Sequence, residues 1–298
     1  METHVNPPGH PEQVARLGAV LDALESCELE RVEAPECTDG DLLLCHPPAF
    51  IDLVKGAAPE VGWRAFDSET MVAPGTVRAA YLSAGGVLTA TDMVLDGAVA
   101  NAFAAVRPPG HHAERERAMG FCFFGNVAIA AKHALERRGL SRVAVVDFDV
   151  HHGNGTQDLL WDEPRALFFS SHQMPLWPGT GRPTERGAHD NVVNIPLAPG
   201  SGGAELRAAY EGHVLPRLRE FDPDLILISA GFDAHAADPL ANLMWVEEDF
   251  AWVTGAICDV ADAVCGGRVV SALEGGYDLP ALGRSARAHV DVLRERGA

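Results

Sequence analysis

The stretch Val143-Ala144-Val145-Val146-Asp147-Phe148-Asp149-Val150-His151-His152-Gly153-Asn154-Gly155 decides the fold class of this chain. It begins as a near-continuous apolar run, which is typical of a strand buried on both faces of a parallel sheet. Carboxylate, imidazole and amide side chains follow at once. In open α/β sheets the ligand site lies at the carboxyl ends of the strands. The stretch therefore predicts a buried parallel strand that delivers chemical groups at its end.

Similar apolar runs recur on both sides of this stretch, and helical patterns separate them. The alternation predicts one doubly wound α/β domain over residues 1–298, with the central sheet flanked by helices. The predicted strands are Val99–Val106, Val143–Phe148, Ala166–Ser170, Val192–Ile195, Leu225–Ser229 and Val269–Leu273, and the predicted helices are Ala128–Arg138, Ala204–Phe221 and Glu247–Val264.

The composition narrows the class of partner. Of 298 residues 47% are hydrophobic and 22% are charged, which excludes a disordered or fibrous chain. Lys and Arg number 23 against 42 Asp and Glu, a net charge of −19. Nucleic-acid binding needs clustered basic side chains, so this balance argues against it. An acidic surface suits cationic substrates, but it also simply keeps a protein dispersed.

The cysteines and the apolar stretches predict a cytoplasmic protein. Six cysteines are scattered without a C-x-x-C pair, so we expect reduced thiols. Residues 1–10 have neither the basic nor the apolar region of a signal peptide. The stretch Ala79–Val106 is interrupted by Asp92 and Asp96, so we expect no membrane span.

Two strand ends carry a candidate metal site. Residues two apart on a strand point to the same side, so Asp147, Asp149 and His151 can share a face. Asp233 follows Leu225–Ser229 and is the natural third ligand beside Asp149 and His151. Two carboxylates and one imidazole balance a dication and leave a position open for water, as in catalytic sites. The alternative is a polar loop capped by Asp and Asn, but burying such groups unpaired costs several kcal/mol, roughly.

Two further segments are weak signals taken alone. His111 and His112 follow the rigid turn Pro108-Pro109-Gly110, and Tyr277 follows Gly275-Gly276. A rigid turn suits a catalytic group, which must be held still. A tandem histidine pair taken alone has no role, at the surface or in the core, about as often as it has one.

Taken together, these segments resemble the histone deacetylase family, in its class II-like and bacterial acetylpolyamine amidohydrolase branch. The resemblance includes His10-Pro11-Glu12 with Arg16, the segment Gly120–Asn126 and the segment Pro178–Gly181, so it spans almost the whole chain. It implies the arginase/deacetylase fold, with a parallel sheet of about eight strands flanked by helices.

The resemblance assigns roles residue by residue. It implies Zn²⁺ held by Asp149, His151 and Asp233, with Tyr277 facing the metal. It implies a catalytic pair in which His111 bonds Asp147 and His112 bonds Asn154, where many relatives have Asp. A carboxylate partner favours imidazolium and an amide does not, so we expect His111 to be the more readily protonated and His112 the neutral base.

The family's mechanism and surroundings follow as expectations. The metal would lower the pKa of a water, a histidine would take its proton, and Tyr277 would stabilise the oxyanion. The implied substrate is an acylated amine: acetyl-lysine in a protein, or an acetylpolyamine or other small amide. A homo-oligomer is compatible with the family. The implied tunnel residues are Gly120, Phe121, Trp177 and Leu240, and the implied potassium site lies around Asp147, Asp149, His151, Ser170 and Ser171.

Individual residues argue for or against the alternative functions. Polyamine-selective relatives carry Glu after the Asp-Pro at the tunnel mouth, whereas Leu240 follows Asp238-Pro239 here. An arginase-like ureohydrolase needs a second Asp two residues after Asp233, where His235 stands. A non-catalytic acyl-binding relative would usually lack a ligand or the tyrosine, and this chain keeps both.

Overall fold

A six-stranded parallel sheet forms the centre of the protein, described by a computed structural model for residues 1–297. Its strand order is β3-β8-β7-β4-β5-β6. This confirms the predicted α/β class, and each strand overlaps a predicted run, although the sheet has six strands where the resemblance implies about eight. The strands are β3 (Asn101–Ala104), β4 (Val143–Asp147), β5 (Ala166–Gln173), β6 (Val192–Leu197), β7 (Leu225–Ala230) and β8 (Val269–Leu273).

Burial along the strands explains why the inner ones read as continuous apolar runs. Every residue of β4, β5, β7 and β8 is buried, because helices cover both faces. Ala144 and Val146 of β4 belong to one hydrophobic core, and Val143 and Val145 belong to the other. Successive side chains of β4 therefore serve opposite faces of the sheet.

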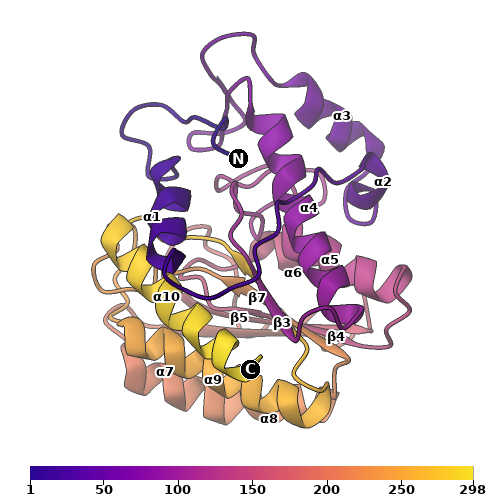
Figure 1. Ribbon diagram of the computed structural model, residues 1–298, viewed down its shortest axis with the longest axis vertical. Coiled ribbons are helices and arrows are strands. Elements are labelled where there is room, and N and C mark those ends of the chain that lie inside the picture. Colours follow the sequence, from indigo (N-terminus) through magenta and orange to yellow (C-terminus); the bar gives the residue numbers. More distant parts are fainter. Residues whose placement is uncertain (298) are drawn as a thin grey trace.

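The helices are divided between these two cores. Figure 1 shows α7, α8 and α9 on one side of the sheet and α4, α5 and α6 on the other. Residues of α1 and α10 join the first core, and residues of α2 and α3 join the second. The helices are α1 (Ala15–Leu24), α2 (Asp39–Leu42), α3 (Pro48–Gly56), α4 (Thr76–Leu95), α5 (Asn126–Glu136), α6 (Asn154–Leu160), α7 (Gly203–Ala209), α8 (Leu215–Phe221), α9 (Glu247–Val264) and α10 (Leu279–Arg296).

Three differences from the predicted elements stand out. The predicted helix Ala204–Phe221 is divided into α7 and α8 by a π-helical turn at Tyr210–Val214. The helices α1, α2, α3, α4, α6 and α10 were not predicted, and α4 overlaps the interrupted apolar region Ala79–Val106. A short antiparallel pair, β1 (Arg64–Ala65) and β2 (Met71–Val72), lies outside the central sheet.

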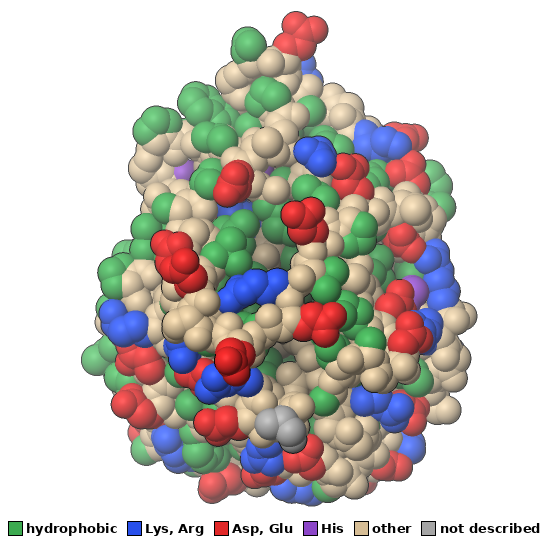
Figure 2. All heavy atoms as spheres, viewed as in Figure 1, with side chains coloured by type: hydrophobic (Ala, Val, Ile, Leu, Met, Phe, Trp, Pro, Cys, Tyr) green, Lys and Arg blue, Asp and Glu red, His purple; other side chains and the backbone are tan. Residues whose placement is uncertain are grey.

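The molecular surface is mixed in charge. On the face drawn in Figure 2, Lys and Arg side chains lie among Asp and Glu side chains rather than in a patch of their own. Ion pairs between exposed side chains include Arg142 with Asp222 at 2.7 Å. Within residues 1–297, no helix combines the length and the apolar character that crossing a membrane requires.

Candidate metal centre and active site

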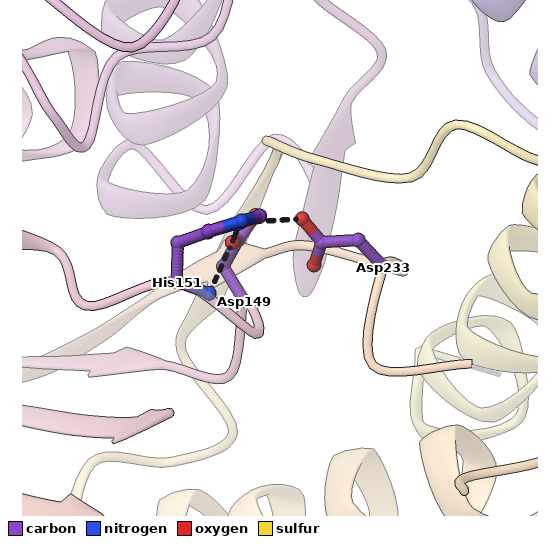
Figure 3. A group of neighbouring side chains, drawn as sticks. All are labelled: Asp149, His151 and Asp233. Carbon is purple, nitrogen blue, oxygen red and sulfur yellow. Dashed lines mark hydrogen bonds and ion pairs between the residues drawn. The ribbon is translucent and has the colours of Figure 1, made fainter. Parts of the chain in front are cut away.

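Three buried side chains converge where two neighbouring strands end (Figure 3). Asp149 and His151 follow β4, and Asp233 follows β7, which pairs directly with β4. Nδ1 of His151 lies 3.3 Å from Oδ1 of Asp149 and 3.1 Å from Oδ2 of Asp233. One ligand atom from each residue lies within 4.8 Å of the other two, so one ion can contact all three.

In each of these carboxylates one oxygen accepts a backbone N–H and the other faces the His151 ring; Oδ1 of Asp149 also accepts the backbone N–H of His151 at 2.9 Å. Gly275 N–H donates to Oδ2 of Asp149 at 2.8 Å, and Val150 N–H donates to Oδ1 of Asp233 at 2.9 Å. Among residues 1–297, neither carboxylate forms an ion pair with Lys or Arg. Two buried carboxylates without a fixed cation and one imidazole nitrogen are a donor set that fits a divalent ion such as zinc.

The pKa of His151 reports the same attraction for positive charge. Burial disfavours its charged form, but hydrogen bonds to Asp149 and Asp233 and their charges outweigh burial and raise its pKa to about 10. The pocket is therefore built to hold a cation.

The histidine pair lies beside this centre with two different partners. Nδ1 of His111 lies 3.0 Å from Oδ2 of Asp147, and Nδ1 of His112 lies 2.8 Å from Oδ1 of Asn154. Burial lowers the pKa of His111, but the charges of Asp149 and Asp147 outweigh burial and hold it well above its usual range. Burial and the neighbouring positive charge of His111 hold the pKa of His112 well below its usual range. The different surroundings thus move the pKa values of the two rings in opposite directions.

Tyr277 lies in the loop after β8, close to Arg16 of α1. The Arg16 guanidinium lies 4.9 Å from the centre of the Tyr277 ring, and its Nε donates to the carbonyl of Gly276 at 2.6 Å. The loop also needs glycine, because a Cβ at Gly275 would lie 2.2 Å from Oδ2 of Asp233. Burial holds the pKa of Tyr277 well above its usual range, so its hydroxyl stays a hydrogen-bond donor.

A cavity of about 520 Å³ joins these groups to the surface. His112, His151 and Tyr277 line it together with all four sequence-predicted tunnel residues: Gly120, Phe121, Trp177 and Leu240. The Trp177 ring packs edge-on against His112 at 4.7 Å between ring centres, and Phe121 packs against Tyr277 at 5.8 Å.

Position 120 requires a glycine, because the His112 and Trp177 rings approach its backbone closely. Its φ is +55°, and a Cβ there would lie 2.5 Å from the His112 ring and 2.6 Å from the Trp177 ring. Such contacts exclude any side chain, so the backbone of Gly120 itself forms the wall.

The expected potassium residues also lie together. Asp147 of β4 and Ser170 of β5 are partners in the sheet, and the Ser171 hydroxyl donates to the carbonyl of Asp147 at 3.4 Å. Ser171 also lies 3.1 Å from the hydroxyl of Tyr210, in the π-helical turn. The sheet therefore brings Asp147, Ser170 and Ser171 together at the ends of β4 and β5.

Sequence reasoning missed several parts of the site. The cavity is also lined by Pro7–Pro11, Ser68 and Glu69, to which the sequence assigned no role in the site. The Glu12 carboxylate binds Arg107 at 2.6 Å in the core, next to the turn that carries the histidine pair. Glu274 was given no role from the sequence, although its side chain accepts hydrogen bonds from the backbone of that turn.

Comparisons with known proteins agree on one family. Residues 10–293 match the model described as the histone deacetylase domain. The chain is 40% identical to the histone deacetylase-like amidohydrolase of Pseudomonas aeruginosa, covering 92% of this chain and 74% of that protein. It is also 40% identical to the polyamine deacetylase HDAC10 of Homo sapiens, covering 95% of this chain and 44% of that protein. The solved structure of the HDA15 HD domain matches with a TM-score of 0.93 and 35% identity, covering 98% of this chain and 85% of that one.

Proposed function

The chain belongs to the histone deacetylase family, a family of hydrolytic deacetylases, and from this premise we propose that it is a zinc-dependent amidohydrolase that removes an acyl group from an aliphatic amine. The observation that carries the proposal is the arrangement of Asp149, His151 and Asp233 beside the histidine pair at the end of a narrow cavity. These are the parts that hydrolysis of an unactivated amide needs: a cation site, a base, an acid and an oxyanion donor.

Asp149, His151 and Asp233 would hold the zinc ion. When bound there, the ion would polarise the amide carbonyl and lower the pKa of a water molecule. The neutral ring of His112 is suited to take the proton from the attacking water. The Tyr277 hydroxyl is suited to donate a hydrogen bond to the carbonyl oxygen as negative charge develops on it. The protonated ring of His111 is suited to supply a proton to the leaving amine.

The cavity walls favour a linear aliphatic amine. Phe121 and Trp177 form apolar walls that would pack against the methylene groups of an acyl-lysine side chain. Gly120 lines the cavity and its carbonyl accepts the Cys122 thiol at 3.2 Å; in the proposal the same carbonyl would also accept the N–H of the substrate amide. We therefore propose an acetyl-lysine peptide as the leading substrate class.

An acetylpolyamine or another small amide is the second candidate. Leu240 lines the cavity where polyamine-selective relatives carry Glu, which argues against recognition of a distant ammonium at that position. Glu69 nevertheless places a carboxylate at the cavity mouth, and the chain is similar to a polyamine deacetylase. Because this carboxylate could bind a distant ammonium group, an acetylated polyamine is included in the test.

We further propose a potassium ion beneath the zinc centre. Asp147, Asp149, His151, Ser170 and Ser171 would surround it, largely through carbonyl and hydroxyl oxygens, which suit a hard cation. Such an ion would brace the end of β4, from which two of the three zinc ligands extend.

The test is amide hydrolysis by protein shown to contain zinc. The panel holds an acetyl-lysine peptide, an acetylated polyamine and a longer acyl-lysine peptide. Turnover that is lost after chelation, and strongly reduced in Tyr277→Phe, supports the proposal, and the ranking of the panel selects the substrate class. If zinc-containing protein turns over no member, the proposal is contradicted and the non-catalytic acyl-binding alternative is favoured.

A further inference from the structure

The Glu274 side chain connects the end of β8 to the turn that carries the histidine pair. It is 1% exposed. Its Oε2 accepts the backbone N–H of Gly110 at 2.7 Å and of His111 at 3.2 Å. Its Oε1 accepts the hydroxyl of Ser229, in β7, at 3.2 Å. One carboxylate therefore joins three segments that are far apart in the sequence.

The next residue connects the same loop to the metal centre. Gly275 N–H donates to Oδ2 of Asp149, and the carbonyl of Gly275 accepts Phe232 N–H at 3.0 Å, one residue before Asp233. The dipeptide Glu274-Gly275 thus holds the histidine turn through a side chain and the metal ligands through its backbone. The distance between the histidine turn and the metal ligands therefore depends on two consecutive residues.

The histidine turn depends on this carboxylate. Gly110 and His111 lie outside the strands, and in residues 1–297 Glu274 is the acceptor for both of their N–H groups. The turn is also packed tightly, since a Cβ at Gly110 would lie 2.6 Å from the backbone nitrogen of Asn126. Buried N–H groups without an acceptor are costly, so loss of the carboxylate would move the turn towards other acceptors.

We propose that Glu274 is a positioning residue, which aims His111 and His112 at the metal centre by accepting the two backbone hydrogen bonds of their turn. The inference rests on the proposed amide hydrolysis, in which the histidines act on atoms next to the metal ligands. A displacement of about 1 Å in such a site costs on the order of 10²-fold in rate.

Three substitutions separate hydrogen bonding, charge and packing. Glu274→Met keeps the length of the side chain and removes both acceptors. Glu274→Asp keeps the charge but draws the oxygens back by one methylene. Glu274→Gln keeps one oxygen for the two N–H groups, and its NH₂ group can donate to the Ser229 hydroxyl. Ser229→Ala is the matched control, because it removes the partner of Oε1 and leaves both backbone hydrogen bonds in place.

The expected result is a loss in kcat without a loss in binding. At saturating zinc we expect Glu274→Met and Glu274→Asp to lower kcat at least tenfold, with KM and zinc affinity within about threefold of wild type. Glu274→Gln should restore most of that loss, and Ser229→Ala should stay within about threefold of wild type. If Glu274→Met does not fold, Glu274→Asp carries the test.

Two outcomes would overturn the proposal. A wild-type kcat in folded, zinc-containing Glu274→Met would mean that the residue has a purely structural role. If Glu274→Met does not fold, a wild-type kcat in Glu274→Asp would mean the same. A kcat in Glu274→Gln as low as in Glu274→Met would assign the effect to charge instead of to the hydrogen bonds.

A readout that does not need turnover separates this inference from the proposed function. The imidazole ¹H–¹⁵N resonances of His111 and His112 should shift in Glu274→Asp and return towards wild type in Glu274→Gln. Inactive wild-type protein would contradict the proposed function, whereas unshifted resonances in Glu274→Asp would contradict the positioning role.

Discussion

If His112 is the proposed base, the residue at position 154 influences the pH at which it can act. Oδ1 of Asn154 lies 2.8 Å from Nδ1 of His112 and carries no net charge. Asn154→Asp would place a carboxylate at the same point and favour the protonated ring. Since His112 must be neutral to accept a proton, we expect the acidic limb of the pH profile of kcat/KM to move to higher pH.

The size of the shift follows from the short distance. Unit charges centred about 4 Å apart interact by about 4 kcal/mol at an effective dielectric constant of about 20. One pKa unit corresponds to about 1.4 kcal/mol, so the upper bound is about 3 units. Carboxylate partners in proteins shift pKa values by about 1–3 units. On the acidic limb, kcat/KM should therefore fall about tenfold for each unit by which the pKa of His112 rises.

The carboxylate of Glu114 would reduce the effect of Asn154→Asp on the pKa of His112. Nδ2 of Asn154 donates to Oε1 of Glu114 at 2.7 Å, so the carboxylate introduced by Asn154→Asp would face Glu114 directly. The repulsion would raise the pKa of the introduced carboxyl group and reduce its charge. Glu114→Gln combined with Asn154→Asp removes this conflict, and Glu114→Gln alone is the control.

The assay is kcat/KM for an acetyl-lysine peptide between about pH 5 and pH 9 at saturating zinc. In the double variant we expect the acidic limb to lie at least about one unit above that of Glu114→Gln. An acidic limb that stays in place or moves to lower pH, in protein with wild-type zinc affinity, would refute the assignment of His112 as the base.

Three further predictions concern the tyrosine, the metal ligands and a buried histidine. Tyr277→Phe should lower kcat by about 10²–10³-fold with zinc content unchanged, because it removes one oxyanion donor; unchanged kcat would exclude this role. Asp233→Ala should abolish the zinc-dependent rise in melting temperature, measured by calorimetry with and without chelator; a persisting rise would place the ion elsewhere. Burial lowers the pKa of His289 to about 3. As the pH decreases from about 6.5 towards 3, His289 is therefore protonated in the unfolded chain but not in the folded protein, and the free energy of unfolding decreases. At pH 5 this amounts to about 2 kcal/mol, and urea unfolding of His289→Gln should show a correspondingly weaker pH dependence; parallel curves would contradict the assignment.

The sequence predicted that the candidate metal ligands lie together, because parallel strands end at one edge of the sheet. Asp149 and His151 follow one apolar run and Asp233 follows another, so their common edge was foreseeable. Their contact also needed β4 and β7 to be neighbours, which they are through pairs such as Val146 with Ile228. That adjacency crosses the chain order, since β5 and β6 come between them in sequence, and only the assembled sheet shows it.

The helix α4 was missed because packing overrides local propensity. Gly85 and Gly86 lie inside it, and glycine costs roughly 1 kcal/mol against alanine in a helix interior. At Gly85 a Cβ would lie 2.0 Å from the carbonyl of Pro35, and at Gly86 it would lie 2.9 Å from Val106. The glycines are thus there to let other segments approach the helix. A pattern read along one segment cannot include contacts made by distant segments.

The histidine pair shows what residue types alone can and cannot settle. The two rings lie 3.9 Å apart between centres, so two positive charges there would repel each other strongly. The sequence offered Asp147 and Asn154 as partners, and that difference already ordered the two pKa values. The structure adds that Asp149 also faces His111, at 3.7 Å from Nε2, so a second carboxylate favours a charge on the same ring. A positive charge on His111 also lowers the pKa of His112, so the proposed division into one acid and one base rests on the different surroundings of two identical side chains.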